Sequence, residues 1–289
     1  MLRLVKSTKN TLALINRVPP EVLSHIPDYY CEDDTDEELI ALTHECRGWR
    51  ATFISRSSLW TQLNFTNFNK ALTYLQRSQS CPLKLYLGCN QVTNDVSALL
   101  TPHIRRLKAL TTEKQALPGV VENFRCHAPL LEKLDINITF IEGHVLNGTF
   151  FNGDLSSLRE LHLVGVLTHL PWKALTNLRV VDLESYRERY GTTQILDFLE
   201  SAPLLHTVLL QYSMPEPWDH PPKRLVPLRH LKVFDIRTTA PHLLLLHHLC
   251  IPPGASLISN FHFCGKESPF LDYLPENPPI LVTSLTSPR

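Results

Sequence analysis

The chain has 289 residues with 28 basic and 28 acidic side chains, so it lacks the basic excess that favours nucleic acid or an anionic membrane. Hydrophobic residues make up 43% of the chain, which is ordinary for a soluble protein, and the length suffices for one large core or two smaller ones. The 22 prolines against 10 glycines indicate many short segments separated by rigid breaks.

The N-terminal segment has no apolar core of the kind found in secretory signals, and no apolar run approaches the ~20 residues of a membrane span. The 7 cysteines are scattered and include no C-x-x-C pair. Such a pattern favours reduced thiols over a disulfide framework. We therefore expect a cytoplasmic or nuclear protein that is not attached to a membrane.

Residues 1–14 read as a tail, and residues 15–65 as a first, helical unit. The double proline at Pro19 and Pro20 predicts the start of a helix, because proline suits a first turn. Thr35 and Glu38 match a capping box, which predicts a second helix beginning near Asp36 and running through Gly48 to residue 53. The stretch "SRSSLW" then predicts a short element that ends at Trp60.

The second predicted helix has apolar residues on more than one face. Leu39, Leu42, Cys46, Trp49 and Phe53 follow three- and four-residue steps along one side. A unit of about 45 residues is too small to bury many apolar side chains alone. Part of its apolar surface should therefore meet either the rest of the chain or another protein.

The remainder of the chain repeats the template L-x-x-L-x-L, with other apolar residues allowed. Copies begin at Leu131, Leu158, Leu178, Leu205, Leu231 and Ile258, which are 27, 20, 27, 26 and 27 residues apart, and weaker copies lie at Leu83 and Leu107. Helix-like segments separate some of the copies, at "TNDVSALLTPH", "TTQILDFLESAP" and "APHLLLLHHLC".

A period of 20 to 29 residues with this template is typical of leucine-rich repeats, in which each strand buries its leucines against the next copy. The asparagine expected after the last apolar position is absent, so the repeats are degenerate. We therefore predict an α/β chain in which a three-helix unit precedes an irregular leucine-rich-repeat solenoid of about eight repeats. The solenoid is assigned to residues 66–270, and residues 271–289 to an irregular C-terminal tail.

The first unit resembles an F-box, in particular the divergent F-box-like form of fungal proteins. Val18-Pro19-Pro20-Glu21 stands where the family has Leu-Pro-x-Glu. "LTHECRGWR" stands at the family's Val-Cys-Lys/Arg-x-Trp stretch, and "SSLW" at its Leu-Trp end. Val18 and Glu45 depart from the family pattern, and the acidic segment from Glu32 to Glu38 is longer than the family norm.

The resemblance implies that the chain docks on the Skp adaptor of an SCF (Skp–cullin–F-box) ubiquitin ligase, and through the adaptor on a cullin. A C-terminal repeat domain then binds the substrate, so the chain itself needs no catalytic residue. On this reading we expect Pro20, Leu23 and Trp60 to be uncovered in the isolated chain. The residues assigned to adaptor binding are Pro19, Pro20, Val22, Leu23, Ile26, Leu39, Cys46, Trp49, Leu59 and Trp60.

Strand positions between the leucines face the open surface of a leucine-rich solenoid. Four of those positions in neighbouring strands hold carboxylates, which could select a basic segment of a substrate. The residues assigned to substrate binding are Asp135, His162, Asp182, Glu184, Gln211, Asp235 and Arg237, with Asn137 in the same strands. The alternative is a solvated surface with no ligand.

Other chemistry finds little support in the sequence. The 14 histidines include no set with the spacing of a structural zinc site, and no phosphate-cradling glycine loop or G-x-S-x-G elbow is present. We therefore expect no catalytic residues, no metal and no cofactor. The alternative function is a ligase-independent repeat scaffold whose first unit is only an N-terminal cap. The sequence names neither the substrate nor the biological process.

Overall fold

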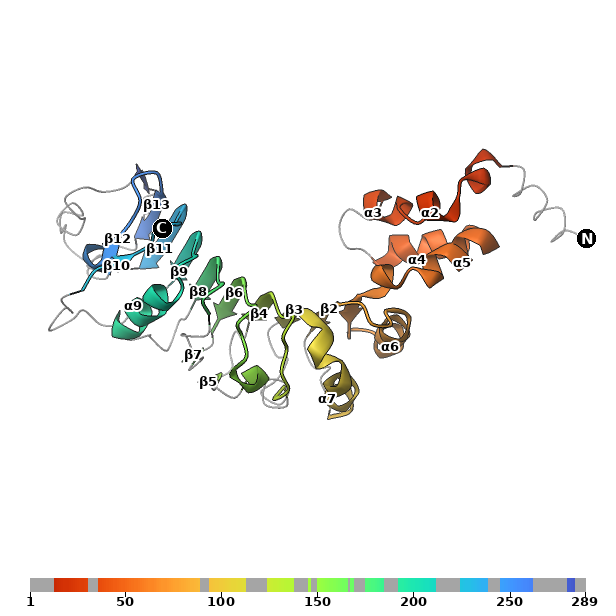
Figure 1. The fold of residues 1–289 in the computed structure, drawn as a ribbon, viewed down its shortest axis with the longest axis horizontal. Coiled ribbons are helices and arrows are strands. Elements are labelled where there is room, and N and C mark those ends of the chain that lie inside the picture. The colour runs from red at the N-terminus through yellow and green to blue at the C-terminus, as the bar shows by residue number, and fades with distance from the viewer. Residues whose placement is uncertain are drawn as a thin grey trace, which may run out of the picture. The chain divides into compact units, whose positions relative to one another are not determined.

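A computed structural model describes residues 13–30, 36–88, 94–112, 124–137, 145–146, 150–165, 167–168, 175–184, 192–211, 224–238, 245–261 and 280–283. The chain divides into two compact units. Unit 1 comprises residues 1–63 and 67–83, and unit 2 comprises residues 64–66 and 84–289. The α/β class is confirmed, since helices predominate in unit 1 and a parallel sheet in unit 2 (Figure 1).

Unit 1 is built from short helices. In chain order they are η1 (Leu14–Arg17), α2 (Pro20–Leu23), α3 (Ile26–Tyr30), α4 (Asp36–His44), α5 (Arg47–Ser55), η2 (Ser57–Trp60) and α6 (Phe68–Arg77). The predicted helix start at the double proline is confirmed, with Pro19 at the N-cap of α2. The N-cap of α6 is Asn67, whose side-chain oxygen accepts a hydrogen bond from the Lys70 N–H at 3.1 Å.

The predicted single helix from residue 36 to residue 53 is wrong, because the structure has two helices there. Helix α4 ends at His44, and Cys46 is the extended N-cap of α5, with φ −154° and ψ 171°. Gly48 therefore lies in the first turn of α5 rather than in the middle of a helix. Helices α4 and α5 pack on each other, and α2 packs on α5. Because the chain breaks between α4 and α5, the apolar residues of this segment lie on two helices that pack on each other and form an interior within unit 1.

Unit 2 is organised around a parallel β-sheet. Its strands are β2 (Leu83–Leu87), β3 (Leu107–Thr112), β4 (Lys133–Asn137), β6 (Glu160–Val164), β8 (Val180–Glu184), β9 (Thr207–Gln211), β11 (Val233–Thr238), β13 (Ser256–Phe261) and β14 (Ile280–Thr283). The short strand β1 (Gln62–Asn64) precedes them in the chain. The spatial order of these strands is their chain order, so each strand pairs with the one before it and the one after it.

The register of the sheet follows the sequence template. Lys133 of β4 pairs with Glu160 of β6, which pairs with Val180 of β8, and that residue pairs with Thr207 of β9. Each of these residues lies two positions after the first leucine of its copy. Strands β4, β6, β8 and β9 share a burial pattern in which the second and fourth residues are buried. The alternating leucines therefore form the core on one face of the sheet.

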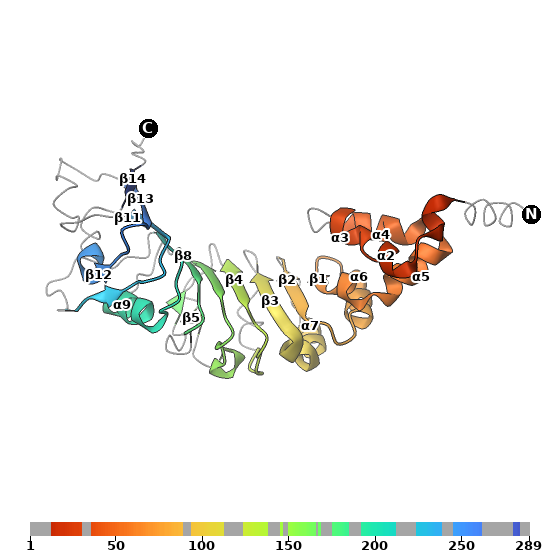
Figure 2. The same cartoon turned by 45° about the horizontal axis from the view of Figure 1, so that its top comes forward.

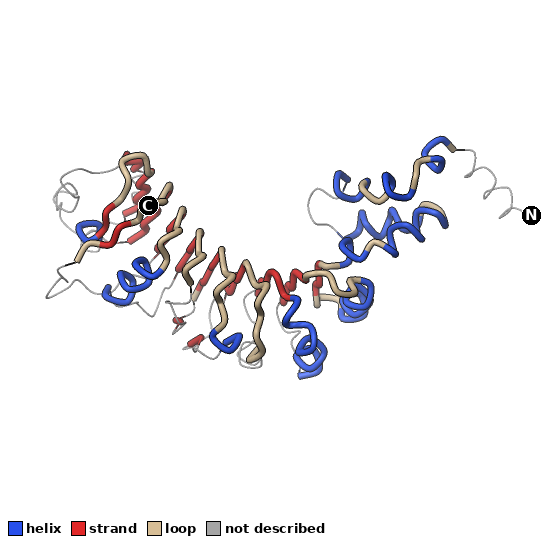
Figure 3. The backbone as a smooth tube through the Cα atoms, viewed as in Figure 1, coloured by secondary structure: helices blue, strands red, loops and turns tan. Residues whose placement is uncertain are grey.

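The described connections place their helical turns on one side of the sheet. Helix α7 (Asn94–Leu100), η3 (Thr101–Arg106), η4 (Phe150–Gly153) and α9 (Thr192–Ser201) lie between strands, and Figures 1 and 2 show α7 and α9 on the same side. Two short parallel pairs accompany them, β5 (Val145–Leu146) with β7 (Leu167–Thr168) and β10 (Val226–Pro227) with β12 (Leu249–Cys250). Figure 3 shows helical turns between some of the strands of unit 2.

The last template copy was placed wrongly. Ser256 of β13 pairs with Val233 of β11, so the residue that matches Leu231 is Gly254, not Ile258. Leu257 is fully buried where the other copies have their second leucine. The copy therefore begins 23 residues after Leu231 and reads "GASLIS". A glycine at the first position of the copy hid it from a template that required an apolar residue there.

Two predictions near the C-terminal end also differ from the structure. Residues 245–248 of "APHLLLLHHLC" form a single 3₁₀ turn, and Leu249–Cys250 form β12 instead of continuing a helix. The irregular structure expected at 271–289 is wrong for Ile280–Thr283, which pair with β13 as the parallel strand β14. The other residues of that tail lie outside the described part of the chain.

Candidate functional site

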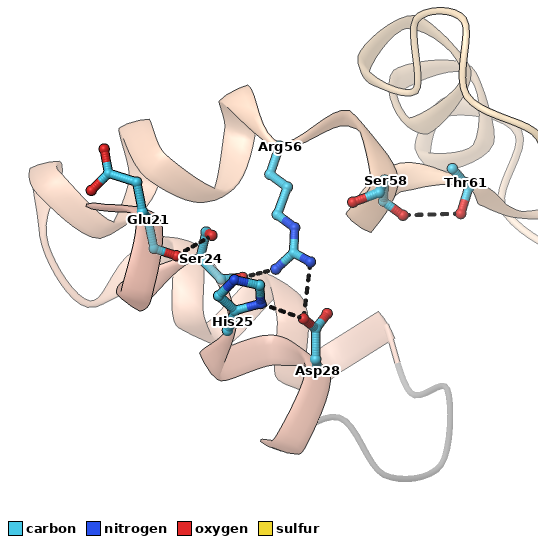
Figure 4. Close-up of polar contacts among 7 residues, drawn as sticks. All are labelled: Glu21, Ser24, His25, Asp28, Arg56, Ser58 and Thr61. Atoms are coloured by element: carbon cyan, nitrogen blue, oxygen red, sulfur yellow. Dashed lines mark hydrogen bonds and ion pairs between the residues drawn. The ribbon is translucent and has the colours of Figure 1, made fainter. Parts of the chain in front are cut away.

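The turn between α2 and α3 is held by Arg56, the residue that follows α5. The Arg56 guanidinium donates hydrogen bonds to the Ser24 backbone oxygen and to the Asp28 carboxylate, the second at 2.9 Å (Figure 4). His25 Nδ1 lies 3.2 Å from the same Asp28 oxygen, and the Ser24 hydroxyl donates to the Glu21 backbone oxygen at 2.6 Å. These contacts fix α2, whose first turn contains Pro20 and Glu21, relative to the end of α5.

Trp60 lies inside unit 1. Its side chain has no exposed surface, and its indole N–H donates to the Phe53 backbone oxygen at 3.0 Å. The Tyr74 ring of α6 contacts it edge-on at 4.9 Å between centroids, and the Arg77 guanidinium lies 4.5 Å from its ring centroid. The expectation that Trp60 is uncovered is therefore wrong, because α5 and α6 of its own unit cover it.

Leu23 and Leu39 are buried as well, with 5% and 7% of their surface exposed. Helix α2 packs on α5, where Phe53 is fully buried against Trp49 at 5.7 Å between ring centroids. Leu39 and Phe53 of the predicted apolar stripe are thus buried within unit 1, and Trp49 of the same stripe packs on Phe53. A buried side chain supports a docking surface from within but contacts no partner unless the unit rearranges.

Other assigned residues of unit 1 remain exposed. Pro19 and Pro20 are exposed, and Val22 has 57% of its surface exposed. Ile26, Cys46, Trp49 and Leu59 are half-buried. Sequence reasoning missed three further exposed apolar side chains nearby in the chain, Leu14 at 78%, Ile15 at 46% and Tyr29 at 82%. We call Leu14, Ile15, Pro19, Pro20 and Val22 the N-terminal apolar set.

The sheet of unit 2 brings the predicted substrate-binding residues into two rows. Asp135 pairs with His162, and His162 with Asp182, and the row continues through Leu209 to Asp235. The second row runs from Asn137 through Val164, Glu184 and Gln211 to Arg237. Because side chains alternate along a strand, both rows lie on the face opposite the buried leucines. We call this surface the open face.

Interactions within the open face satisfy only part of its polar groups. His162 Nδ1 lies 3.7 Å from an Asp182 carboxylate oxygen, and Arg237 donates to Asp235 at 3.2 Å and to Gln211 at 3.3 Å. Asp182 Oδ1, Asp235 Oδ1 and Arg237 Nε are buried without a hydrogen-bond partner in the structure. Buried unpaired oxygens favour a donor supplied from outside, so this geometry suits binding by hydrogen bonds and charge.

Neither unit offers an arrangement for metal or membrane chemistry among the described residues. No group of three or more His, Cys, Asp or Glu side chains in that part of the chain is placed to hold a metal ion. None of the helices that the structure describes combines the length and apolar character needed to cross a bilayer. His262 and Cys264, two residues apart in the sequence, lie outside the described residues.

No protein-family model matches the sequence, and no curated protein matches it either. The F-box-like reading therefore depends on the residues of unit 1 themselves.

Proposed function

We propose that this chain is the substrate-recognition subunit of an SCF-type ubiquitin ligase in the cytoplasm or nucleus. In this proposal unit 1 is an F-box-like domain that docks on a Skp-type adaptor, and through it on a cullin. Unit 2 is a leucine-rich-repeat domain that binds the protein to be ubiquitinated. The chain contributes binding and positioning, and other subunits carry out ubiquitin transfer.

The leucine-rich-repeat assignment is supported by the order and register of the sheet. Five template copies, from Leu131 to Leu231, pair at equivalent positions, and their strands follow one another in chain order. Each copy buries its leucines against its neighbours, as a repeat that cannot close a core alone must do. Connections of different length, with an α-helix in only some of the described ones, agree with degenerate repeats.

The adaptor assignment is carried by the exposure of Val22 and its neighbours. Val22 is 57% exposed although the adjacent Leu23 is 5% exposed, so α2 turns one apolar residue inward and one outward. The outward residue lies directly after the Pro-Pro-Glu segment at which the family docks on its adaptor. Burying an exposed valine or leucine contributes about 1.5–3 kcal/mol. We therefore assign the contact to the N-terminal apolar set, together with the half-buried residues Ile26, Cys46, Trp49 and Leu59.

Co-purification with a Skp-type adaptor tests this assignment. We expect a one-to-one complex with the full chain, and its loss in the double variant Leu14→Asp, Val22→Asp. Leu225→Asp is the matched control, since Leu225 is 63% exposed but belongs to unit 2. An adaptor that never binds, or that binds the double variant as well as the parent chain, contradicts the proposal. Trp60→Ala is unsuitable for this test because it damages the interior of unit 1.

A second candidate function is favoured by the burial of Leu23 and Trp60. If the F-box-like pattern serves only the interior of unit 1, the chain is a repeat scaffold that acts without a ligase. The two functions differ in one observable: the scaffold binds its partner through unit 2 and ignores the adaptor.

The open face is the proposed contact for a basic segment of the substrate. Asp182 and Glu184 lie two residues apart on β8, at the centre of both rows. Charge reversal of both to lysine should abolish capture of a substrate that binds there. Capture that survives the reversal removes the open face from the proposal and leaves adaptor docking unaffected.

A further inference from the structure

A further row of charged residues, separate from the two rows of the open face, crosses unit 2 just before the strands begin. The backbone N–H of Arg159 donates to Glu132 O, that of Arg179 to Arg159 O, that of His206 to Arg179 O, and that of Lys232 to His206 O. Glu132 N–H donates in the same way to Lys108 O. These residues all hold the second position of their template copies. We call Arg159, Arg179, His206 and Lys232 the basic row.

The arginines and the lysine of the basic row have no ion-pair partner among the described residues. Arg159, Arg179 and Lys232 are all exposed. Glu132, the carboxylate next to Arg159 in the same line, lies 3.5 Å from Lys108 on its other side. Neighbouring strands lie about 4.8 Å apart, so the four positions of the row span roughly 14 Å.

A surface cavity opens between the first two cations of the row. It has a volume of about 220 Å³ and is lined by Arg159, Arg179, Glu132, Ser157, Asn177 and Leu130, among others. Ser157 donates its hydroxyl proton to Pro129 O at 2.7 Å, and Asn177 donates from its amide to Ser156 O at 2.8 Å. These bonds hold the two polar walls in place, while the guanidinium groups beside them form no ion pair within the part of the chain that the structure describes.

The electrostatic environment of His206 agrees with a concentration of positive charge along this line. Burial lowers its pKa, and the charges of Lys232, Arg179 and His230 lower it further. The His206 and His230 rings lie 6.3 Å apart between centroids.

We propose that the basic row is a binding site for an acidic peptide segment, whose first carboxylate enters the cavity between Arg159 and Arg179. Paired guanidinium forks bind carboxylates through two parallel hydrogen bonds. An extended segment advances about 6.7 Å for every two residues, so three acids at alternate positions span about 13 Å, close to the length of the row. The aspartates of the open face lie about 10 Å further along the strands and repel such a segment there.

This inference rests on the proposed function in one respect, that the segment belongs to the substrate of unit 2. It differs from the open-face proposal in both location and charge. The site binds its ligand without any covalent step, and the adaptor has no part in it.

Fluorescence anisotropy with the full chain tests the site directly. The probe is a labelled seven-residue peptide with glutamates at alternate positions, and its sibling carries glutamines instead. We expect the glutamate peptide to bind and the glutamine peptide not to bind. Raising the salt concentration should weaken binding, because exposed charges are screened.

Three variants locate the binding. Arg159→Gln with Arg179→Gln should weaken it at least tenfold, and Arg159→Lys with Arg179→Lys should weaken it less, since the charge stays and the fork is lost. Glu132→Gln should strengthen it. Arg105→Gln is the matched control, because Arg105 is an exposed arginine on η3 outside the row.

Equal binding of the two peptides, or unchanged binding by the double glutamine variant, overturns the proposal. A peptide with a single phosphoserine that binds tenfold tighter than the glutamate peptide through the same arginines overturns the acidic class in favour of a phosphoryl group. Because no adaptor is present, failure here leaves adaptor docking standing, and loss of adaptor docking leaves this result standing.

Discussion

The two units of this chain bury their apolar residues by different means. The interior of unit 1 includes a few large aromatic side chains from helices of different length. Trp60, Phe53 and Tyr74 occupy positions that have no equivalent elsewhere in the unit. The core of unit 2 repeats the same leucine positions from strand to strand. In a repeated pattern, every copy indicates independently which positions are buried. A single helix gives only one such indication. The sequence therefore predicted the buried leucine positions well in unit 2 and predicted the buried side chains poorly in unit 1.

The largest test of this difference is Trp60→Ala. We expect it to destabilise unit 1 by about 3–5 kcal/mol, because it leaves a cavity between α5 and α6 and removes the hydrogen bond from the indole N–H to Phe53 O. Thermal unfolding followed by circular dichroism measures the change. Val22→Ala is the control, since most of Val22 is exposed, and it should change stability by less than about 0.5 kcal/mol. A Trp60→Ala variant as stable as the parent would mean that Trp60 is not part of the interior.

In unit 2 the corresponding change is Leu161→Ala in β6. Leu161 is fully buried between Leu134 and Val181 of the neighbouring strands, so we expect a loss of about 2–4 kcal/mol in chemical denaturation. The next residue, His162, faces the open side, and its replacement by alanine should cost less than about 1 kcal/mol. Similar costs at the two positions would contradict the alternation of buried and open faces.

The corrected register of β13 is tested by two neighbouring residues. Leu257 is fully buried and Ile258 is half-buried, so Leu257→Ala should cost about 2–3 kcal/mol and Ile258→Ala roughly half as much. Urea unfolding of the two variants measures the difference. A larger loss of stability for Ile258→Ala than for Leu257→Ala would instead support a template copy that begins at Ile258.

Removal of the Arg56 contacts that hold the turn between α2 and α3 should have a smaller effect on stability. Arg56→Ala removes a partly exposed ion pair with Asp28 and a hydrogen bond to Ser24 O, for a loss of about 1 kcal/mol in unit 1. Arg56→Lys should recover part of it. Because the Arg56 contacts position α2, hydrogen exchange of the α2 amides should also accelerate in Arg56→Ala. Unchanged exchange would show that α2 is held by packing alone.

The smallest expected effect is a dependence of stability on pH. Burial lowers the pKa of His206, with help from nearby cations, and burial with Arg106 lowers the pKa of His103. Their neutral forms are favoured in the folded state, so the unfolded chain binds more protons below its ordinary histidine pKa of about 6.5. The free energy of unfolding should therefore be highest above that pH and should decrease as the pH drops below it. His206→Gln should make the fall shallower, and an unchanged slope would contradict this cause.

The sequence allowed most of the sheet to be predicted and little of the N-terminal surface. Five copies were placed correctly because a leucine stands at every first position, and the sixth was misplaced because Gly254 replaces it. Trp60 was read as exposed because composition cannot show that α6, beyond the expected boundary at residue 65, covers it. The sequence did not predict the basic row because its successive members are 20 to 27 residues apart, and only the backbone pairing brings them into one line.

The identity of spatial and chain order in the sheet has a consequence for synthesis. Every strand of the main sheet from β3 onward meets a partner that has already left the ribosome, so this sheet can grow by one strand at a time without waiting for a distant segment. Each arriving strand covers the hydrogen-bonding edge of the one before it, which shortens the time for which any edge stays open to another chain.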